Sequence, residues 1–128
     1  MTHKPCILMI DDASMVRLYH RGILEAQGYE VDEAINGIEA LEKVLSRRFD
    51  LYLVDVNMPK LDGYGFLREL RRQAIPQAPA LMISTEAQLQ DLQRALDAGA
   101  NFYLVKPIRP DVLASFCRLL LQRPGDRP

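Results

Sequence analysis

Four short apolar runs in this sequence each end at side chains that can take part in chemistry. These side chains are Asp11 and Asp12 after residues 6–10, Asp55 after 51–54, Ser84 and Thr85 after 80–83, and Lys106 after 102–105. Crowded carboxylates repel one another, and a hard divalent cation relieves the repulsion; oxygen ligands favour Mg²⁺. A carboxylate is also a nucleophile that can form an aspartyl-phosphate. The residue types therefore indicate Mg²⁺-dependent phosphoryl transfer to Asp55, with the Ser84 hydroxyl and the Lys106 ammonium contacting the remaining phosphoryl oxygens.

For this chemistry, the four runs must end at one place, and the pattern of elements predicts that they do. Five predicted strands, at residues 6–10, 30–34, 51–54, 80–83 and 102–105, alternate with five amphipathic segments. Short connections imply right-handed crossovers, which give a parallel sheet with helices on both faces. Uninterrupted apolar runs are typical of covered strands, whereas the acid-rich residues 30–34 favour an edge strand. The carboxyl ends of parallel strands share one rim, where ligands bind in open α/β sheets.

The helices are predicted from caps and from apolar residues at three- and four-residue spacing. Ser14 is expected to cap the first helix and Gly28 to close it, while Asn36 and Glu39 have the spacing of a capping box. The residues expected on buried helix faces are Val16, Tyr19, Ile23 and Leu24; Ile38, Leu41, Val44 and Leu45; Phe66, Leu67 and Leu70; Leu89, Leu92 and Leu96; and Leu113, Phe116, Cys117 and Leu120. Arg68, Arg71 and Arg72 are expected on the solvent side of the third helix.

Length and composition indicate a single ordinary globular domain. The chain has 128 residues, 48% of them hydrophobic, and a formal net charge of −1, so a footprint for nucleic acid is not predicted. Cys6 and Cys117 fall in apolar patterns and are expected to be buried thiols, which suits a reducing compartment. Neither a signal peptide nor a membrane span is predicted, and the expected location is cytoplasmic. Residues 1–121 are expected to form the domain, and residues 122–128 a tail or linker stub.

Each candidate residue also has a plainer interpretation when it is taken alone. Asp12 stands beside the expected cap Ser14, Lys106 precedes a proline as turn residues often do, and Ser84 could cap the next helix. His3 and His20 have no partner pattern and are interpreted as structural or exposed. Four such signals at one rim are far less probable by chance than any single one, so the set carries the functional hypothesis.

With these residues in place, the sequence resembles the receiver domain of two-component response regulators, and closely the small single-domain chemotaxis type. The resemblance runs from about Lys4 to about Leu121. The residues that carry it are the acidic pair Asp11-Asp12, Asp55, the loop residues Met58-Pro59 and Asp62-Gly63, Ser84, and Lys106-Pro107. It implies a flavodoxin-like (βα)5 fold with the strand order 2-1-3-4-5.

The resemblance also implies roles for individual residues. Mg²⁺ would be held by Asp12, Asp55 and the backbone carbonyl of Asn57, with Asp11 acting through water. Asp55 would be the phosphoacceptor, Ser84 the switch hydroxyl, Lys106 the phosphoryl contact and Tyr103 the switch aromatic, with a cis bond before Pro107. Ser84 stands where threonine is commoner, and Thr85 takes a position where small residues are frequent, which would slow access to the phosphoryl group.

The implied function is a phosphorylation-dependent signalling switch. A sensor histidine kinase or phosphotransfer protein would supply the phosphoryl group, and the fourth helix, fifth strand and last helix would present an altered face to a downstream protein. Such a switch promotes only its own phosphorylation and dephosphorylation and contacts neither nucleic acid nor membrane directly. Val112 and Leu119 lie beside the buried stripe of the last helix and suggest a partner or homodimer face; a merely wide buried stripe explains them equally well.

Three alternatives stay open. An Mg²⁺-dependent aspartyl-phosphate phosphatase is disfavoured because Asp55-Val56-Asn57 lacks a second carboxylate two residues on, and the chain leaves no room for a cap domain. The chain could also be a receiver domain cut from a longer DNA-binding or effector regulator. Flavin binding on the same fold requires a glycine- and hydroxyl-rich loop after the first strand, where this chain has Asp11-Asp12.

Overall fold

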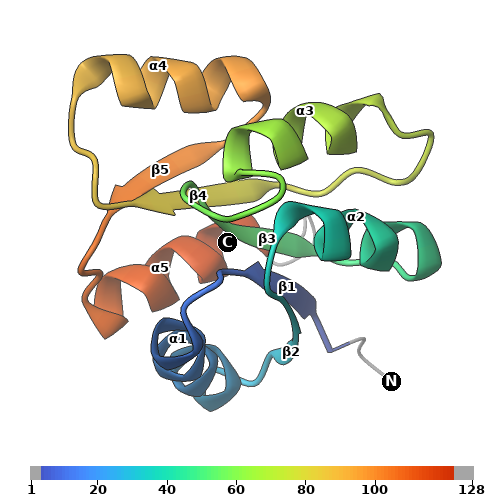
Figure 1. The fold of residues 1–128 in the computed structure, drawn as a ribbon. Helices are drawn as coiled ribbons and strands as arrows, with labels where there is room; N and C mark the ends of the chain where they lie inside the picture. The colour runs from blue at the N-terminus through green and yellow to red at the C-terminus, as the bar shows by residue number, and fades with distance from the viewer. Residues whose placement is uncertain (1–3, 123–128) are drawn as a thin grey trace.

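The computed structural model describes residues 4–122 and contains one five-stranded parallel sheet between two layers of helices (Figure 1). The strands are β1 (Cys6–Ile10), β2 (Glu30–Ala34), β3 (Leu51–Asp55), β4 (Ala80–Ser84) and β5 (Phe102–Val105). The helices are α1 (Ser14–Ala26), α2 (Gly37–Ser46), α3 (Gly63–Arg72), α4 (Leu89–Ala98) and α5 (Pro110–Leu120). The strand order β2-β1-β3-β4-β5 confirms the predicted topology.

Each face of the sheet has its own hydrophobic core, which explains why the central strands read as continuous apolar runs. Helices α1 and α5 cover one face, and α2, α3 and α4 cover the other (Figure 1). Along β1, Ile7 and Met9 point into the first core, while Cys6, Leu8 and Ile10 point into the second. All five are buried, so a polar residue on either side of β1 would lack solvent.

The two edges of the sheet are β2 and β5. The prediction that residues 30–34 form an edge strand is confirmed. Residues 102–105 form the other edge strand, which fits the expected order, and here Phe102 is 38% exposed and Val105 is 42% exposed. The Phe102 ring packs edge-on against Phe116 of α5, with 5.2 Å between ring centroids. Apolar surface therefore remains along this edge.

The predicted caps are only partly correct. Ser14 is the first residue of α1 rather than its cap; the cap is Ala13, whose side chain makes no capping bond. Instead, the Asp11 carboxylate accepts the Ala13 N–H at 2.9 Å and so stabilises the turn that leads into α1. Asn36 does cap α2, since its side chain accepts the Glu39 N–H at 2.9 Å. The Glu39 carboxylate bonds the N–H of residue 35, one position before the cap.

Several leucine and isoleucine positions predicted to be buried are exposed. They are Ile38 and Leu45 of α2 and Leu89 and Leu96 of α4. Alanines take the inward positions instead: Ala40 in α2, and Ala95 and Ala98 in α4. Residue spacing alone did not distinguish the alanines that face the core from the leucines and isoleucines at the edge of the buried face. By contrast, the inward stripe predicted for α3, with Phe66, Leu67 and Leu70, is buried as expected.

Arg71 was expected to face solvent, and this is also wrong. Its guanidinium donates to the carbonyl oxygens of Gly99, at 2.9 Å from Nη2, and of Ala78, at 2.8 Å from Nη1. It also contacts the side chains of Gln77 and Asn101. Gly99 has a φ of 115°, and a Cβ there would lie 2.7 Å from Arg71 Cγ. Arg71 therefore ties the segment before β4 to the turn after α4.

Both cysteines are buried and free, as predicted. Burial raises the pKa of the Cys117 thiol to about 12, so this group is an inert core residue. Within residues 4–122, none of the helices is both long and apolar enough to cross a membrane. His3 and all of the expected tail except Gln122 lie outside the described residues.

Replacing Arg71 with methionine should lower the free energy of unfolding by about 2 kcal/mol, because the Gly99 and Ala78 carbonyls lose their donor. The matched control is Arg72→Met. The Arg72 side chain is 71% exposed and pairs with Glu69, so this change should stay within about 0.5 kcal/mol. Urea unfolding followed by circular dichroism measures both. Equal losses for the two variants would contradict the structural role of Arg71.

Candidate functional site

The structure brings three carboxylates together at the carboxyl ends of β1 and β3. One carboxylate oxygen from each of Asp11, Asp12 and Asp55 lies within 4.8 Å of the others. Asp55 ends β3 and is 5% exposed, and Asp11 follows β1 and is 1% exposed. Asp12 is exposed, so the cluster opens to solvent on its side. The parallel arrangement of β1 and β3 places these residues side by side although Asp12 and Asp55 are 43 positions apart in the chain.

The Lys106 ammonium reaches into this cluster from the end of β5. Lys106 Nζ donates to Asp55 Oδ1 at 2.8 Å and to Asp11 Oδ2 at 3.1 Å. The bond between Lys106 and Pro107 is cis, as the family resemblance implied. The Lys106 side chain is only 17% exposed, so these charge-assisted hydrogen bonds are shielded from bulk solvent.

Burial raises the pKa of Asp55, and the neighbouring charges of Asp11 and Asp12 raise it further, against the opposing effect of Lys106. Burial lowers the pKa of Lys106, but the contacts with Asp55 and Asp11 outweigh it, and the net shift is upward. The ammonium therefore stays protonated at neutral pH. Three carboxylates facing one ammonium make the pocket a strong attractor for a further cation.

The donor set fits Mg²⁺. The cluster offers carboxylate oxygens from Asp11, Asp12 and Asp55, and contains neither a sulfur nor a nitrogen ligand among the described residues. Mg²⁺ prefers such hard oxygen ligands and keeps several water molecules, which the exposed side at Asp12 can accommodate. Asn57 lies two residues beyond Asp55 on the exposed loop, and the part of its backbone carbonyl in metal binding stays a prediction.

The loop after Asp55 depends on a close backbone approach. A Cβ at Gly63 would lie 2.4 Å from the Asp55 carbonyl oxygen, so only glycine fits there. The Gly63 N–H donates to the Val56 carbonyl at 2.9 Å. Asp62 caps α3 by accepting the Gly65 N–H at 2.8 Å. The Asp62-Gly63 pair thus begins α3 directly against the strand that carries Asp55.

Ser84 and Tyr103 are joined through the main chain of Glu86. Ser84 ends β4 and is 1% exposed, and its Oγ accepts the Glu86 N–H at 3.0 Å. The Tyr103 hydroxyl donates to the Glu86 carbonyl at 2.8 Å. Ser84 does not cap α4, which begins at Leu89 with Gln88 as its cap. The exposed Thr85 lies beside Lys106 in the lining of one hollow.

His20 was interpreted as structural or exposed, and the structure buries it beside the site, which the sequence did not indicate. It lies in α1, is 2% exposed, and its Nδ1 has no hydrogen-bond partner among the described residues. Burial lowers its pKa, and it lies close enough to Asp11 and Lys106 to feel both charges. With Lys106 and Thr85 it lines a mainly apolar hollow of about 290 Å³. A histidine without a partner pattern gives no signal for such a position in the sequence.

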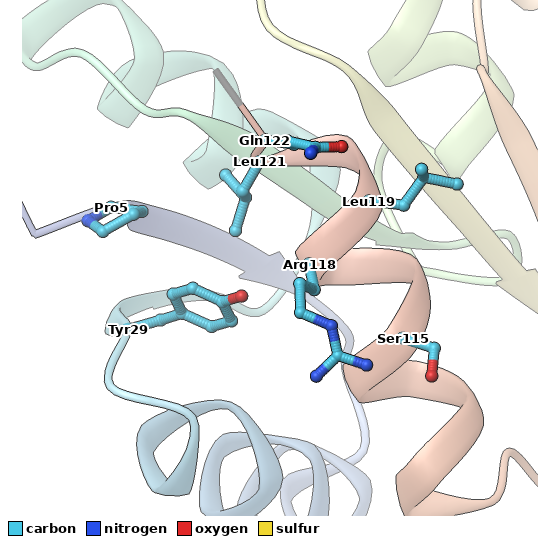
Figure 2. A pocket seen from close by; sticks show the side chains of 7 residues that line it. All are labelled: Pro5, Tyr29, Ser115, Arg118, Leu119, Leu121 and Gln122. Carbon is cyan, nitrogen blue, oxygen red and sulfur yellow. The ribbon is translucent and has the colours of Figure 1, made fainter. Parts of the chain in front are cut away.

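A wider hollow of about 650 Å³ lies elsewhere, where β1 begins and α5 ends (Figure 2). It is lined by Pro5, Tyr29, Ser115, Arg118, Leu119, Leu121 and Gln122. None of the carboxylates at the carboxyl ends of the strands borders it. The chemistry indicated by the sequence therefore lies at the opposite end of the sheet from this hollow.

A flavodoxin-like sheet with an acidic cluster at its carboxyl rim and a lysine after the last strand defines the class of phosphoacceptor signalling domains. The sequence model for the response regulator receiver domain matches residues 7–118, and the chain belongs to that family.

Three curated relatives illustrate where such domains occur. A gliding motility regulatory protein of Myxococcus xanthus is 42% identical over 101 residues, which cover 78% of this chain and 13% of that protein. The sensor protein EvgS of Escherichia coli K12 is 38% identical over 95% of this chain and 10% of that protein. The transcriptional regulatory protein ResD of Bacillus subtilis is 34% identical over 95% of this chain and 50% of that protein. The chain thus spans half or less of each relative.

Solved structures share both the fold and part of the sequence. The chemotaxis response regulator CheY4 of Vibrio cholerae superposes with a TM-score of 0.87 at 35% identity, covering 93% of this chain and all of that one. The receiver domain of the sensor histidine kinase PA1611 of Pseudomonas aeruginosa gives 0.86 at 29% identity, covering 93% and 98%. That structure holds a magnesium ion in its active site cleft.

Replacing His20 with leucine should make folding less sensitive to acid. The unfolded-state pKa is ordinary and the folded-state pKa is lowered by burial, so stability is fully present above the unfolded value and is lost as pH falls below it. Between pH 7.5 and 5.5 the parent should lose on the order of 1 kcal/mol more than His20→Leu. Urea unfolding at both values without divalent cations measures this. Equal losses in the parent and in His20→Leu would contradict this interpretation of His20.

Proposed function

We propose that Asp55 accepts a phosphoryl group from a phosphohistidine on a sensor histidine kinase or phosphotransfer protein. Receiver domains are phosphorylation-dependent switches of two-component systems, and membership of the family places the chain in that class. The observation that carries the assignment to Asp55 is its position: a buried carboxylate, 2.8 Å from Lys106 Nζ, beside two further carboxylates. Asp12 is exposed and Asp11 already accepts bonds from Ala13 and Lys106, so both suit ligand roles better.

In the proposed transfer, an Asp55 oxygen forms a bond to phosphorus as the bond from phosphorus to the donor imidazole breaks. Mg²⁺, when bound, would neutralise charge on the phosphoryl oxygens. Lys106 supplies a second positive charge already in contact with Asp55. The Ser84 Oγ is an acceptor in its present bond and keeps its own proton to donate to a phosphoryl oxygen. The exposed Thr85 would restrict access of water to the product.

The switch would run through the main chain of Glu86. If Ser84 turns towards the phosphoryl group, its bond to the Glu86 N–H is strained or lost, and the carbonyl of the same residue holds Tyr103. The two bonds therefore bias one another, and phosphorylation shifts a population between two arrangements of this loop. The face affected is formed by α4, β5 and α5, where Phe102, Val105 and Leu119 are exposed.

We infer a downstream protein target, or a second copy of the chain, at that face. Leu119 is 58% exposed, as the hypothesis requires. Val112 is only half-exposed and packs on the core shared by α1 and α5, so it contributes less than expected. We also propose action in the cytoplasm, for which the free thiols of Cys6 and Cys117 are suited.

A phosphatase and a fragment of a longer regulator are the competing proposals. The phosphatase still lacks a second carboxylate at residue 57, which is asparagine, and would show repeated turnover of substrate. The longer regulator gains support from the curated relatives, each at least twice the length of the matched region. In both cases we propose residues 1–121 as the receiver unit and 122–128 as a tail or linker.

Phosphorylation of Asp55 is tested by intact-mass analysis after incubation with acetyl phosphate, with and without Mg²⁺. The parent should gain one phosphoryl group only with Mg²⁺, and Asp55→Asn should gain none, because an amide is not a competent nucleophile. Asp62→Asn is the matched control: asparagine also caps helices, so this variant should label like the parent. Equal labelling of Asp55→Asn and parent would remove Asp55 from its proposed role.

The proposed face is tested with Leu119→Glu. A buried charge in an apolar contact should weaken phosphorylation-dependent self-association by about fivefold or more, measured by analytical ultracentrifugation of both phosphorylation states. Leu45→Glu places the same change at a 62% exposed leucine of α2 and should have no effect. A parent that stays monomeric in both states would rule out the homodimer, and unaltered self-association of Leu119→Glu would rule out its placement on this face.

A further inference from the structure

The guanidinium of Arg17 joins two segments that meet at the acidic cluster. Its Nη1 donates to the backbone carbonyl of Asp11 at 2.7 Å, and its Nε donates to the Glu33 carboxylate at 2.8 Å. Arg17 lies in the first turns of α1, and its side chain is 16% exposed. The contact to Asp11 is made to the main chain, so sequence spacing gives no indication of it.

The backbone at Asp11 is held from three directions. The Asp11 N–H donates to the Ala34 carbonyl at 3.1 Å, at the end of β2. The Asp11 carboxylate accepts the Ala13 N–H at 2.9 Å. The Asp11 carbonyl accepts from Arg17, and this is the one contact of the three that depends on the side chain of another residue.

This backbone determines where Asp12 stands. Within residues 4–122, the Asp12 carboxylate makes neither a hydrogen bond nor an ion pair, and it is exposed. Its place near Asp11 and Asp55 therefore follows from the main chain that carries it. A loosened turn would let Asp12 leave the cluster at little cost in folding energy.

Glu33 is the second partner of the Arg17 guanidinium, which links it to the Asp11 carbonyl. It pairs with both Arg17 and Arg21, and these contacts hold its pKa below the usual range even though burial raises it. Arg21 bonds the second oxygen of Glu33 and the Val31 carbonyl, but not Asp11. The two arginines thus share one carboxylate, and only Arg17 extends from it to the acidic cluster.

We propose that Arg17 is a positioning residue that sets the affinity of the acidic cluster for Mg²⁺ by fixing the main chain of Asp11 and Asp12. The proposal rests on the proposed function, in which this cluster holds the ion. Mg²⁺ demands near-ideal octahedral geometry, so its affinity responds to the placement of each oxygen ligand.

Electrostatics and positioning predict opposite signs for the loss of Arg17. Removing a cation near three carboxylates would by itself tighten the binding of Mg²⁺. Removing the Arg17 contacts would weaken the binding of Mg²⁺, because the carboxylate ligands would then lose conformational freedom when the ion binds. The pairing with Glu33 offsets the charge of Arg17, so the positioning effect dominates.

The test is the Mg²⁺ dissociation constant measured by isothermal titration calorimetry on the unphosphorylated chain. Arg17→Gln should raise the constant about tenfold. Arg21→Gln removes the same charge from the same carboxylate and should stay within about twofold. Arg17→Lys keeps the charge but cannot hold both partners in the same way, so it should also weaken binding. Labelling by acetyl phosphate should recover to the parent rate in Arg17→Gln once Mg²⁺ is saturating.

Three results would overturn the proposal: an unchanged or tighter constant in Arg17→Gln, equal effects of Arg17→Gln and Arg21→Gln, or a labelling deficit that excess Mg²⁺ does not restore. Urea unfolding with EDTA shows whether each variant is folded, and Arg17→Lys keeps the test valid if Arg17→Gln is not. Failure of the proposed function looks different: the parent itself would bind no Mg²⁺, or would bind it equally in Asp55→Asn.

Discussion

The repulsion among Asp11, Asp12 and Asp55 is the constraint on which the rest of this structure depends. Three carboxylates within 4.8 Å of one another, two of them buried, are unfavourable in isolation. Groups from neighbouring segments offset part of this repulsion. Lys106 brings an ammonium from the end of β5, and Ala13 offers a backbone N–H to Asp11. The remaining negative charge is left for a cation, so an unfavourable arrangement in the folded chain becomes affinity for a ligand.

The parallel sheet supplies the rigidity that this arrangement requires. Asp11 and Asp55 are attached to adjacent central strands, β1 and β3, whose residues are buried on both faces. Neither strand can shift without exposing one core or the other. Gly63 then lets α3 begin in contact with the Asp55 carbonyl, so the strand end has no room to move outward. Asp12 lacks such support, and its position is correspondingly easier to change.

The sequence was sufficient for the topology and for the meeting of the site residues, because both follow from strand polarity. Asp55 and Ser84 are the last residues of their strands, and Asp11 and Lys106 directly follow theirs. A parallel sheet brings all of these strand ends to one rim. Side-chain contacts between elements were not accessible in the same way. Arg71 and Arg17 bind backbone carbonyls outside their own helices. The spacing of residue types does not indicate such main-chain partners. The exposed leucines of α4 were mistaken for core because Ala95 and Ala98 occupy the inward positions.

Asp55 and Asp12 differ in burial, and the difference suits the parts proposed for them. Burial raises the pKa of Asp55 and removes water from its oxygens, so a phosphoryl group bound there would be shielded from hydrolysis. Asp12, exposed at the mouth, can exchange water and metal without disturbing the core. Ser84 is buried close to the rim while its loop reaches the surface through Glu86 and Tyr103. A change at the buried Ser84 can therefore reach a surface open to partners through the main chain of one residue, Glu86, and neither core has to be repacked.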